Sequence, residues 1–167
     1  YQYKASLLIA LVNGMSSNEL YIETKGTEDA LLKKNKDIII EIQIKKDNNQ
    51  LSLSKLIDWL VHFQEQKHDN NLLYRILSND NTTCLFVTNA RCNDEISFLR
   101  KQLSLLEPHR NVKTSSLWLN KFIKLLGNKK FGTTELKTKR LEFCKKQSKE
   151  IKGKTNIFTN ALNRIII

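Results

Sequence analysis

The chain is 167 residues long and has 28 lysines and arginines against 17 aspartates and glutamates, a formal net charge of +11. With 40% hydrophobic residues, one proline and five glycines, the composition is that of a folded domain and excludes a disordered or low-complexity chain. The longest apolar run, Leu7 to Val12, is far shorter than the roughly 18 residues of a membrane helix. It also lacks the cleavage pattern of a signal peptide.

The positive charge favours a polyanionic partner, because lysines and arginines near phosphates release counterions and supply affinity. A lysine-rich bias of the genome would give the same charge. Three cysteines without CxxC spacing, Cys84, Cys92 and Cys144, point to neither a zinc site nor a disulfide framework. We therefore expect a reduced, cytoplasmic setting and no membrane partner.

The first 92 residues alternate between helical and strand patterns. An almost wholly apolar stretch predicts a helix over residues 3–15, buried on most of its circumference. Strand patterns follow around 20–22, at 30–32 and over 37–46. A helix over 52–68, capped by Ser52 or Ser54, and a strand over 83–88 complete a predicted α/β sandwich.

From residue 93 onward the pattern is helical, with helices expected to end at Pro108, Gly127 and Gly153. Because no linker separates the halves, residues 93–167 are predicted to be a helical part of the same domain as the core, residues 1–92. Tyr1 in place of Met, and the apolar end at 165–167, suggest a piece of a longer protein.

The strand over 37–46 is the most informative segment. Side chains alternate along a strand, so its isoleucines share one face while Glu41, Gln43 and Lys45 share the other. A half-exposed amphipathic strand would alternate in the same way. However, the helix and strand that follow predict a sheet covered on both faces, where charged groups need a cavity or a partner.

Acidic residues precede this strand, at Glu23 and at Glu28-Asp29. Carboxylates beside a strand with a polar-x-Lys pair are what metal-dependent phosphodiester hydrolysis requires. Oxygen ligands hold Mg²⁺, and an ammonium group lies beside the attacking hydroxide. The pattern therefore favours a nuclease site.

With these residues the chain resembles the PD-(D/E)xK nuclease superfamily in its Q-x-K variant. It is similar to the N-terminal effector endonuclease domains of bacterial anti-phage defence proteins that are fused to SAVED nucleotide-sensing domains or to STAND NTPases. The resemblance covers about residues 1–90 and is carried by Tyr1-Gln2, Glu28-Asp29, Gln43-Ile44-Lys45 and Phe86-Val87-Thr88-Asn89. It implies a restriction-endonuclease-like αβββαβ core, here with a helical C-terminal half.

The resemblance implies that Asp29 binds the metal and that Lys45 is the catalytic lysine, with Gln43 where most of the superfamily has a second acid. Mg²⁺ is the implied cofactor, with Mn²⁺ as a substitute. Because a carboxamide binds Mg²⁺ more weakly than a carboxylate, a further acid is expected, Glu41 first and Glu23 second. In the alternative interpretation, Asp29 only starts a strand and Gln43 is a structural amide.

The function that the resemblance implies is cleavage of double-stranded DNA with little sequence preference. Activity would be switched on in a homo-oligomer assembled through a sensor domain outside this sequence. The basic residues expected to track the phosphates are Lys46, Lys137, Arg140, Lys145 and Lys149.

Alternatives remain open at this stage. The lysine-rich C-terminal helix can be a merely solvated face. The chain can also be a non-catalytic nucleic-acid-binding module on a degenerate nuclease fold, or an interaction domain of a larger assembly. His62 and His68, six residues apart on one predicted helix, lie on different faces and are expected at the surface.

Overall fold

The computed structural model describes residues 2–12, 18–22, 29–34, 38–47, 49–62, 71–100, 114–132 and 134–167. Its elements, in chain order, are α1 (Gln2–Val12), β1 (Asn18–Ile22), β2 (Ala30–Lys34), β3 (Ile38–Lys45), α2 (Leu53–Leu60), α3 (Leu72–Ser78), β4 (Thr82–Thr88), the 3₁₀ turn η3 (Ser97–Leu99), α4 (Ser116–Gly127), α5 (Glu135–Gly153), α6 (Thr155–Leu162) and β5 (Ile165–Ile166). This order confirms the predicted helix, three strands, helical crossover and fourth strand.

The strands form one mixed sheet in the order β1-β2-β3-β4-β5. β1, β2 and β3 are an antiparallel meander, whereas β3, β4 and β5 run parallel. Parallel neighbours need a crossover connection, which α2 and α3 supply between β3 and β4, and α4 to α6 supply between β4 and β5. The chain is therefore a mixed α/β protein.

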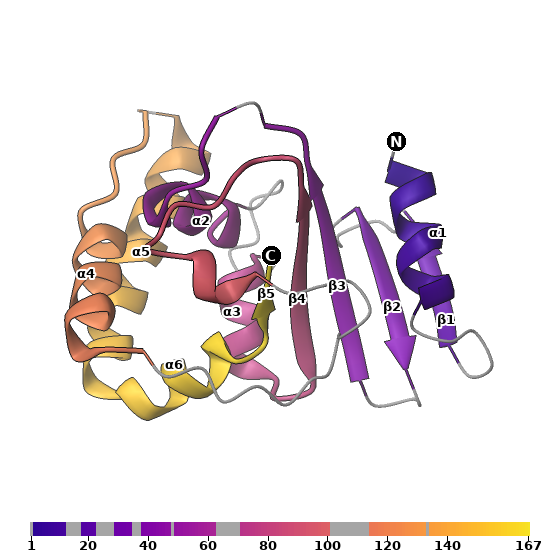
Figure 1. The fold of residues 1–167 in the computed structure, drawn as a ribbon. Helices are drawn as coiled ribbons and strands as arrows, with labels where there is room; N and C mark the ends of the chain where they lie inside the picture. Colours follow the sequence, from indigo (N-terminus) through magenta and orange to yellow (C-terminus); the bar gives the residue numbers. More distant parts are fainter. Residues whose placement is uncertain are drawn as a thin grey trace.

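Helices cover both faces of the sheet (Figure 1), with α1 beside β1 and β2 and the other helices gathered beyond β4. Ile40, Ile42 and Ile44 pack in one apolar cluster with Ile9 and Ala10 of α1. The opposite face, which carries the even-spaced polar residues of β3, packs against a larger cluster from α2 to α6. The predicted alternation along β3 is confirmed.

Helix α1 is buried on one side only, so the prediction for its circumference is wrong. Ile9 and Ala10 face the sheet, whereas Leu7, Leu8 and Leu11 are 48%, 53% and 54% exposed. A helix that contacts one sheet turns only part of its circumference toward it, so this contact cannot cover every residue of a continuous apolar run.

Three elements have no separate counterpart in the sequence analysis: α3, α6 and β5. Asn71 caps α3, its Oδ1 accepting from the Tyr74 amide at 2.8 Å. The guanidinium of Arg164, which directly precedes β5, donates to the carbonyls of Ile76 at 2.6 Å and Asn79 at 2.7 Å, at the end of α3. The last strand thus holds the end of the crossover helix.

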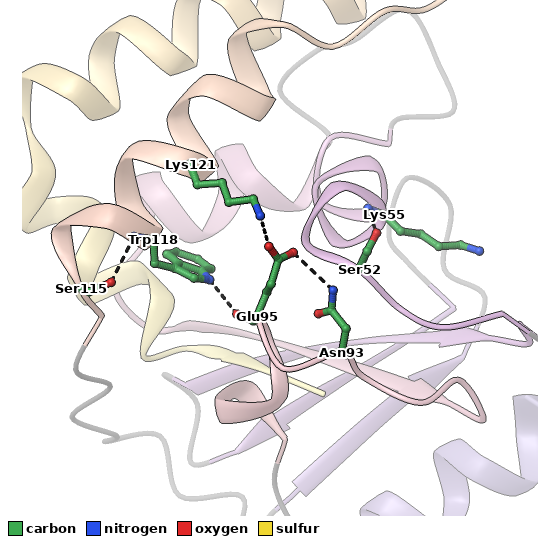
Figure 2. Close-up of polar contacts among 7 residues, drawn as sticks. All are labelled: Ser52, Lys55, Asn93, Glu95, Ser115, Trp118 and Lys121. Atoms are coloured by element: carbon green, nitrogen blue, oxygen red, sulfur yellow. Dashed lines mark hydrogen bonds and ion pairs between the residues drawn. The ribbon is translucent and has the colours of Figure 1, made fainter.

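Helix α4 fixes the segment that follows β4 (Figure 2). The indole of Trp118 donates to the Glu95 carbonyl at 2.7 Å, and the Glu95 carboxylate pairs with Lys121 and accepts from Asn93. Ser115 caps the helix by accepting from the Trp118 amide at 3.2 Å. The loop beyond β4 is therefore tied to a helix at several points.

Some predicted elements are only partly described. Helix α2 starts at the predicted Ser52 cap and ends at Leu60, earlier than the predicted helix over 52–68, of which residues 63–68 lie outside the described residues. Of the helix expected to end at Pro108, the structure describes η3 and not residues 101–113. Within the described ranges, no helix has the length and apolarity to cross a membrane.

Candidate active site at the carboxyl end of β3

Asp29, directly before β2, lies beside the carboxyl end of β3. The antiparallel register of the two strands, continued by one residue, sets Asp29 opposite Gln43. The Ile44 amide donates to Oδ2 of Asp29 at 2.6 Å, which holds the carboxylate against the β3 backbone next to Lys45. The structure thus brings together three residues that the sequence assigned to one site: Asp29, Gln43 and Lys45.

The site becomes more exposed along β3. Gln43 is fully buried, with Phe86 of β4 as its neighbour. Lys45, beside Thr88 at the end of both strands, is half-buried, as is Asp29. A substrate can therefore approach the site from the Lys45 end.

Glu41, the first choice for a second acidic ligand, is held by another residue. Its carboxylate accepts from Nε of Arg75 at 2.7 and 2.8 Å and forms a second ion contact with the same guanidinium at 2.5 Å. Such a bidentate pair engages both oxygens. Glu41 is therefore engaged by Arg75, and its expected role as a metal ligand stays a prediction. Arg75 belongs to α3, a helix that the sequence analysis did not predict.

The described residues supply few metal ligands. Among them, no group of three or more His, Cys, Asp and Glu side chains could hold a metal ion. Glu23, the second choice, and Glu28 lie outside the described residues. The carboxylate of Asp29 and the carboxamide of Gln43 remain as oxygen donors. They suit Mg²⁺, which often binds through one or two protein groups and completes its shell with water and phosphate oxygens.

His62 is influenced electrostatically by two cations, Arg140 and Lys45. His62, which follows α2, is half-buried, and its pKa is lowered by burial and then by the charges of Arg140 and Lys45. His62 is therefore neutral at pH 7 and lies within electrostatic reach of both cations. The expectation of an ordinary surface histidine is corrected, because helix spacing alone does not reveal which strand end lies across from a residue.

The predicted DNA-binding residues of α5 divide into two groups. Arg140 is half-buried, 5.4 Å above the ring centroid of Phe131, and burial lowers its pKa. Lys137, Lys145 and Lys149 lie on the exposed side of the helix, at spacings of eight and four residues. Arg140 thus packs against Phe131, whereas the three lysines form an exposed stripe.

A pocket lies beyond the ends of β3 and β4, which the sequence analysis did not identify. Its volume is about 330 Å³ and it is lined by Asp47, Asn49, Gln50, Asn89, Ala90 and Arg91. Lys46, also predicted to bind DNA, is exposed and joins β3 to this pocket. Only Asn89 had been noted in the sequence, as the end of a strand motif.

Comparisons of the chain with protein-family models, with curated proteins and with solved structures found no match. The functional argument therefore rests on the residues themselves. A carboxylate, a carboxamide and a lysine meet at one strand end, with a neutral histidine and an arginine nearby. Such a set can hold a hydrated divalent cation and attract a phosphate group.

Proposed function

We propose that the chain is a metal-dependent endonuclease domain that hydrolyses phosphodiester bonds of double-stranded DNA. The observation that carries the proposal is the placement of Asp29 against β3, with Gln43 opposite and Lys45 next to it. The Q-x-K resemblance and the observed order of helix, three strands, crossover and strand support a restriction-endonuclease-like core. The net charge of +11 suits a polyanionic substrate.

The residues divide the work as follows. Asp29 and Gln43 would hold Mg²⁺, which supplies Lewis-acid chemistry and an acidified water when bound. Lys45 stabilises the negative charge that develops on the phosphate in the transition state. The charge of Arg140, which like that of Lys45 acts on His62, would add to the attraction of a phosphate. The same proposal includes that the active form is a homo-oligomer bound to DNA. The homo-oligomer would assemble through a domain outside this sequence.

The test is cleavage of supercoiled plasmid with Mg²⁺ or Mn²⁺, using protein clustered through a self-associating fusion. Lys45→Ala should abolish cleavage at every metal concentration, because it removes transition-state charge stabilisation. Asp29→Ala should also abolish it, but through weaker metal binding, so that raised Mn²⁺ restores part of the activity. Lys4→Ala, an exposed lysine of α1 on the other face of the sheet, is the control and should cut like the wild type.

Wild-type rates in both variants would place the site elsewhere. One observation favours a second candidate, a non-catalytic nucleic-acid-binding module: Glu41 is held by Arg75, which leaves Asp29 as the described carboxylate beside Gln43. This candidate predicts salt-dependent DNA binding and no cleavage with either metal, even for clustered wild-type protein.

A further inference from the structure

Helix α1 has two apolar sides, and the sheet covers only one of them. Ile9 and Ala10 pack against the sheet, whereas Leu7, Leu8 and Leu11 are about half exposed. At about 100° per residue, these three leucines lie within an arc of about 100° on the other side of the helix, which we call the leucine arc. An apolar arc of this width is typical of a helix face that packs against another element.

The leucine arc stands apart from the rest of the described surface. Among the described elements, only α1 exposes more than one large apolar side chain. Single exposed hydrophobic residues are normal on a protein surface, but a group of neighbouring ones marks an interaction site. Helix α1 lies at the opposite end of the molecule from α4 and α5 (Figure 1), and on the other face of the sheet from the cluster that packs on Gln43. A partner on the leucine arc therefore leaves the candidate active site and the α5 lysines free.

The distribution of charge favours a second copy of this chain as that partner. Two chains that each carry a net charge of +11 repel one another. Residues 1–22, however, contain one lysine and one glutamate, so their formal charge is zero. This end of the molecule can therefore approach its own copy with little repulsion. By contrast, helices that lie in a membrane surface are rich in lysine and arginine, and Lys4 is the one charged residue of α1.

Two α1 helices fit together best in an antiparallel pair. Lys4 is exposed and precedes Leu7 by three residues and Leu8 by four, so it lies on the same side as the leucine arc. An antiparallel pair centred between Leu7 and Leu8 sets each Lys4 opposite Leu11 of the other copy. There it lies near a helix carboxyl end, which favours positive charge and has no basic residue of its own. A parallel pair would instead set the two lysines side by side. The surface is therefore complementary to itself, as a two-fold symmetric interface requires.

We propose that the leucine arc binds the same arc of a second copy of this chain, in an antiparallel dimer with two-fold symmetry. The leucines supply the affinity, and Lys4 affects mainly the orientation. Three half-exposed leucines are far less than the roughly 800 Å² that each partner buries in a stable complex, so we expect a weak dimer with a Kd of about 0.1 mM. Copies held together by another domain reach millimolar effective concentrations, at which the dimer forms. Only this last step rests on the proposed function.

The first experiment is sedimentation equilibrium of the chain in EDTA and without DNA, from about 10 µM to about 1 mM protein, which brackets the expected Kd. The average mass should rise toward that of a dimer. It should rise further at high salt, because salt screens the repulsion between the positive copies and not the apolar contact. The triple variant Leu7→Gln/Leu8→Gln/Leu11→Gln should stay monomeric. Leu117→Gln/Ile157→Gln, which replaces exposed apolar side chains of α4 and α6, is the control and should dimerise like the wild type.

A second experiment needs only one substitution in each protein. With a short bis-maleimide, Leu8→Cys should cross-link between copies, whereas Leu117→Cys should give no more cross-linking than the wild type with its native cysteines. Circular dichroism verifies that each variant is folded.

Three results would overturn the proposal: a wild type that stays monomeric up to about 1 mM, a dimer that survives the triple variant, or equal cross-linking at both positions. Binding of a monomeric wild type to phosphatidylcholine vesicles, abolished by the triple variant, would also overturn it and assign the leucine arc to a membrane. None of these measurements involves DNA or metal, so failure here is distinct from failure of the nuclease proposal.

Discussion

Glu41 and Asp29 lie on one polar face of the sheet but have different partners. Glu41 is 4% exposed and is engaged by a guanidinium, whereas Asp29 accepts from a main-chain amide at the strand end. A buried carboxylate needs such a cation, because desolvation of an unpaired charge costs several kcal/mol. Arg75 is therefore a structural residue of this face, and Asp29 is the acid that a ligand can reach.

Arg75→Leu should destabilise the protein by about 3 kcal/mol, because the variant leaves the Glu41 carboxylate buried without its cation. Urea denaturation followed by circular dichroism measures the loss. Adding Glu41→Gln should recover part of it. Lys139→Ala, which breaks the exposed pair with Glu135, is the control and should cost less than about 1 kcal/mol. Equal losses from both variants would contradict the assignment.

His62 makes stability depend on pH. Burial and then the charges of Arg140 and Lys45 lower its pKa below the ordinary 6.5, so between these two values the unfolded state binds more protons than the folded state. The contribution of neutral His62 to the free energy of unfolding is therefore complete above pH 6.5. It is lost as the pH falls toward the lowered pKa of the folded state. The free energy of unfolding of His62→Gln should fall less than that of the wild type from about pH 8 to about pH 5. Parallel profiles would contradict this.

At the scale of elements, α5 presents opposite faces to the protein and to solvent. Phe143, Cys144 and Ile151 are buried, and burial raises the pKa of the Cys144 thiol to about 12. The thiol is therefore protonated and unreactive, as expected for a core cysteine. The exposed side carries the stripe of Lys137, Lys145 and Lys149.

Replacing Lys137, Lys145 and Lys149 by Gln should weaken binding to all duplex sequences alike, because phosphate contacts carry no base information. The slope of log affinity against log salt should fall by about 0.9 for each lost contact. Fluorescence anisotropy at several salt concentrations measures both effects. Lys4→Gln, on the opposite face of the sheet, should change neither. Unchanged affinity in the triple variant would show that these three lysines are merely solvent-exposed and do not contact DNA.

Helix and strand patterns along the sequence predicted most elements of the fold. The alternation of β3, the Ser52 cap of α2 and the ends of α4 and α5 at Gly127 and Gly153 are local signals, and the structure confirms them. α3 was missed, although Asn71 before an apolar pair is a capping signal. β5 has only two residues, and a strand that short is defined by its partner rather than by its own pattern.

Prediction of the candidate site was also partial. Strand alternation placed Gln43 with Lys45, and Asp29 joins them through a bond between residues 15 positions apart. The pairing of Glu41 with Arg75 spans 34 positions, and the effect of Lys45 on His62 depends on how a helix lies over the sheet. Such contacts depend on packing between elements, which no local pattern specifies.

At the scale of the whole molecule, β5 joins both halves of the chain into one core. Ile165 lies in the apolar cluster that α2 to α6 share, while its neighbour Ile166 lies in the cluster under α1. Both side chains are almost fully buried. The end of the sequence therefore contributes to both faces of the sheet.

Ile165→Ala should cost about 2–4 kcal/mol, the usual range for a buried isoleucine, and should lower the melting temperature by roughly 5–15 °C. Calorimetry should show one transition, because helices from both halves share that cluster. Ile157→Ala, where the side chain is 47% exposed, should change stability by no more than about 0.5 kcal/mol. Two separate transitions in the wild type would show that the halves unfold independently.

The contacts of Arg164 with the end of α3 also affect how the chain folds during its synthesis. These bonds join residues 85 and 88 positions apart. At the usual rate of about 5–20 residues per second, the ribosome needs roughly 4–17 s to add that length of chain. Until then, the outer edge of β4 has no β5 beside it, and an unpaired edge strand is a template for association with other chains. We therefore expect the yield of folded protein to depend on elongation speed and on chaperones that shield nascent chains.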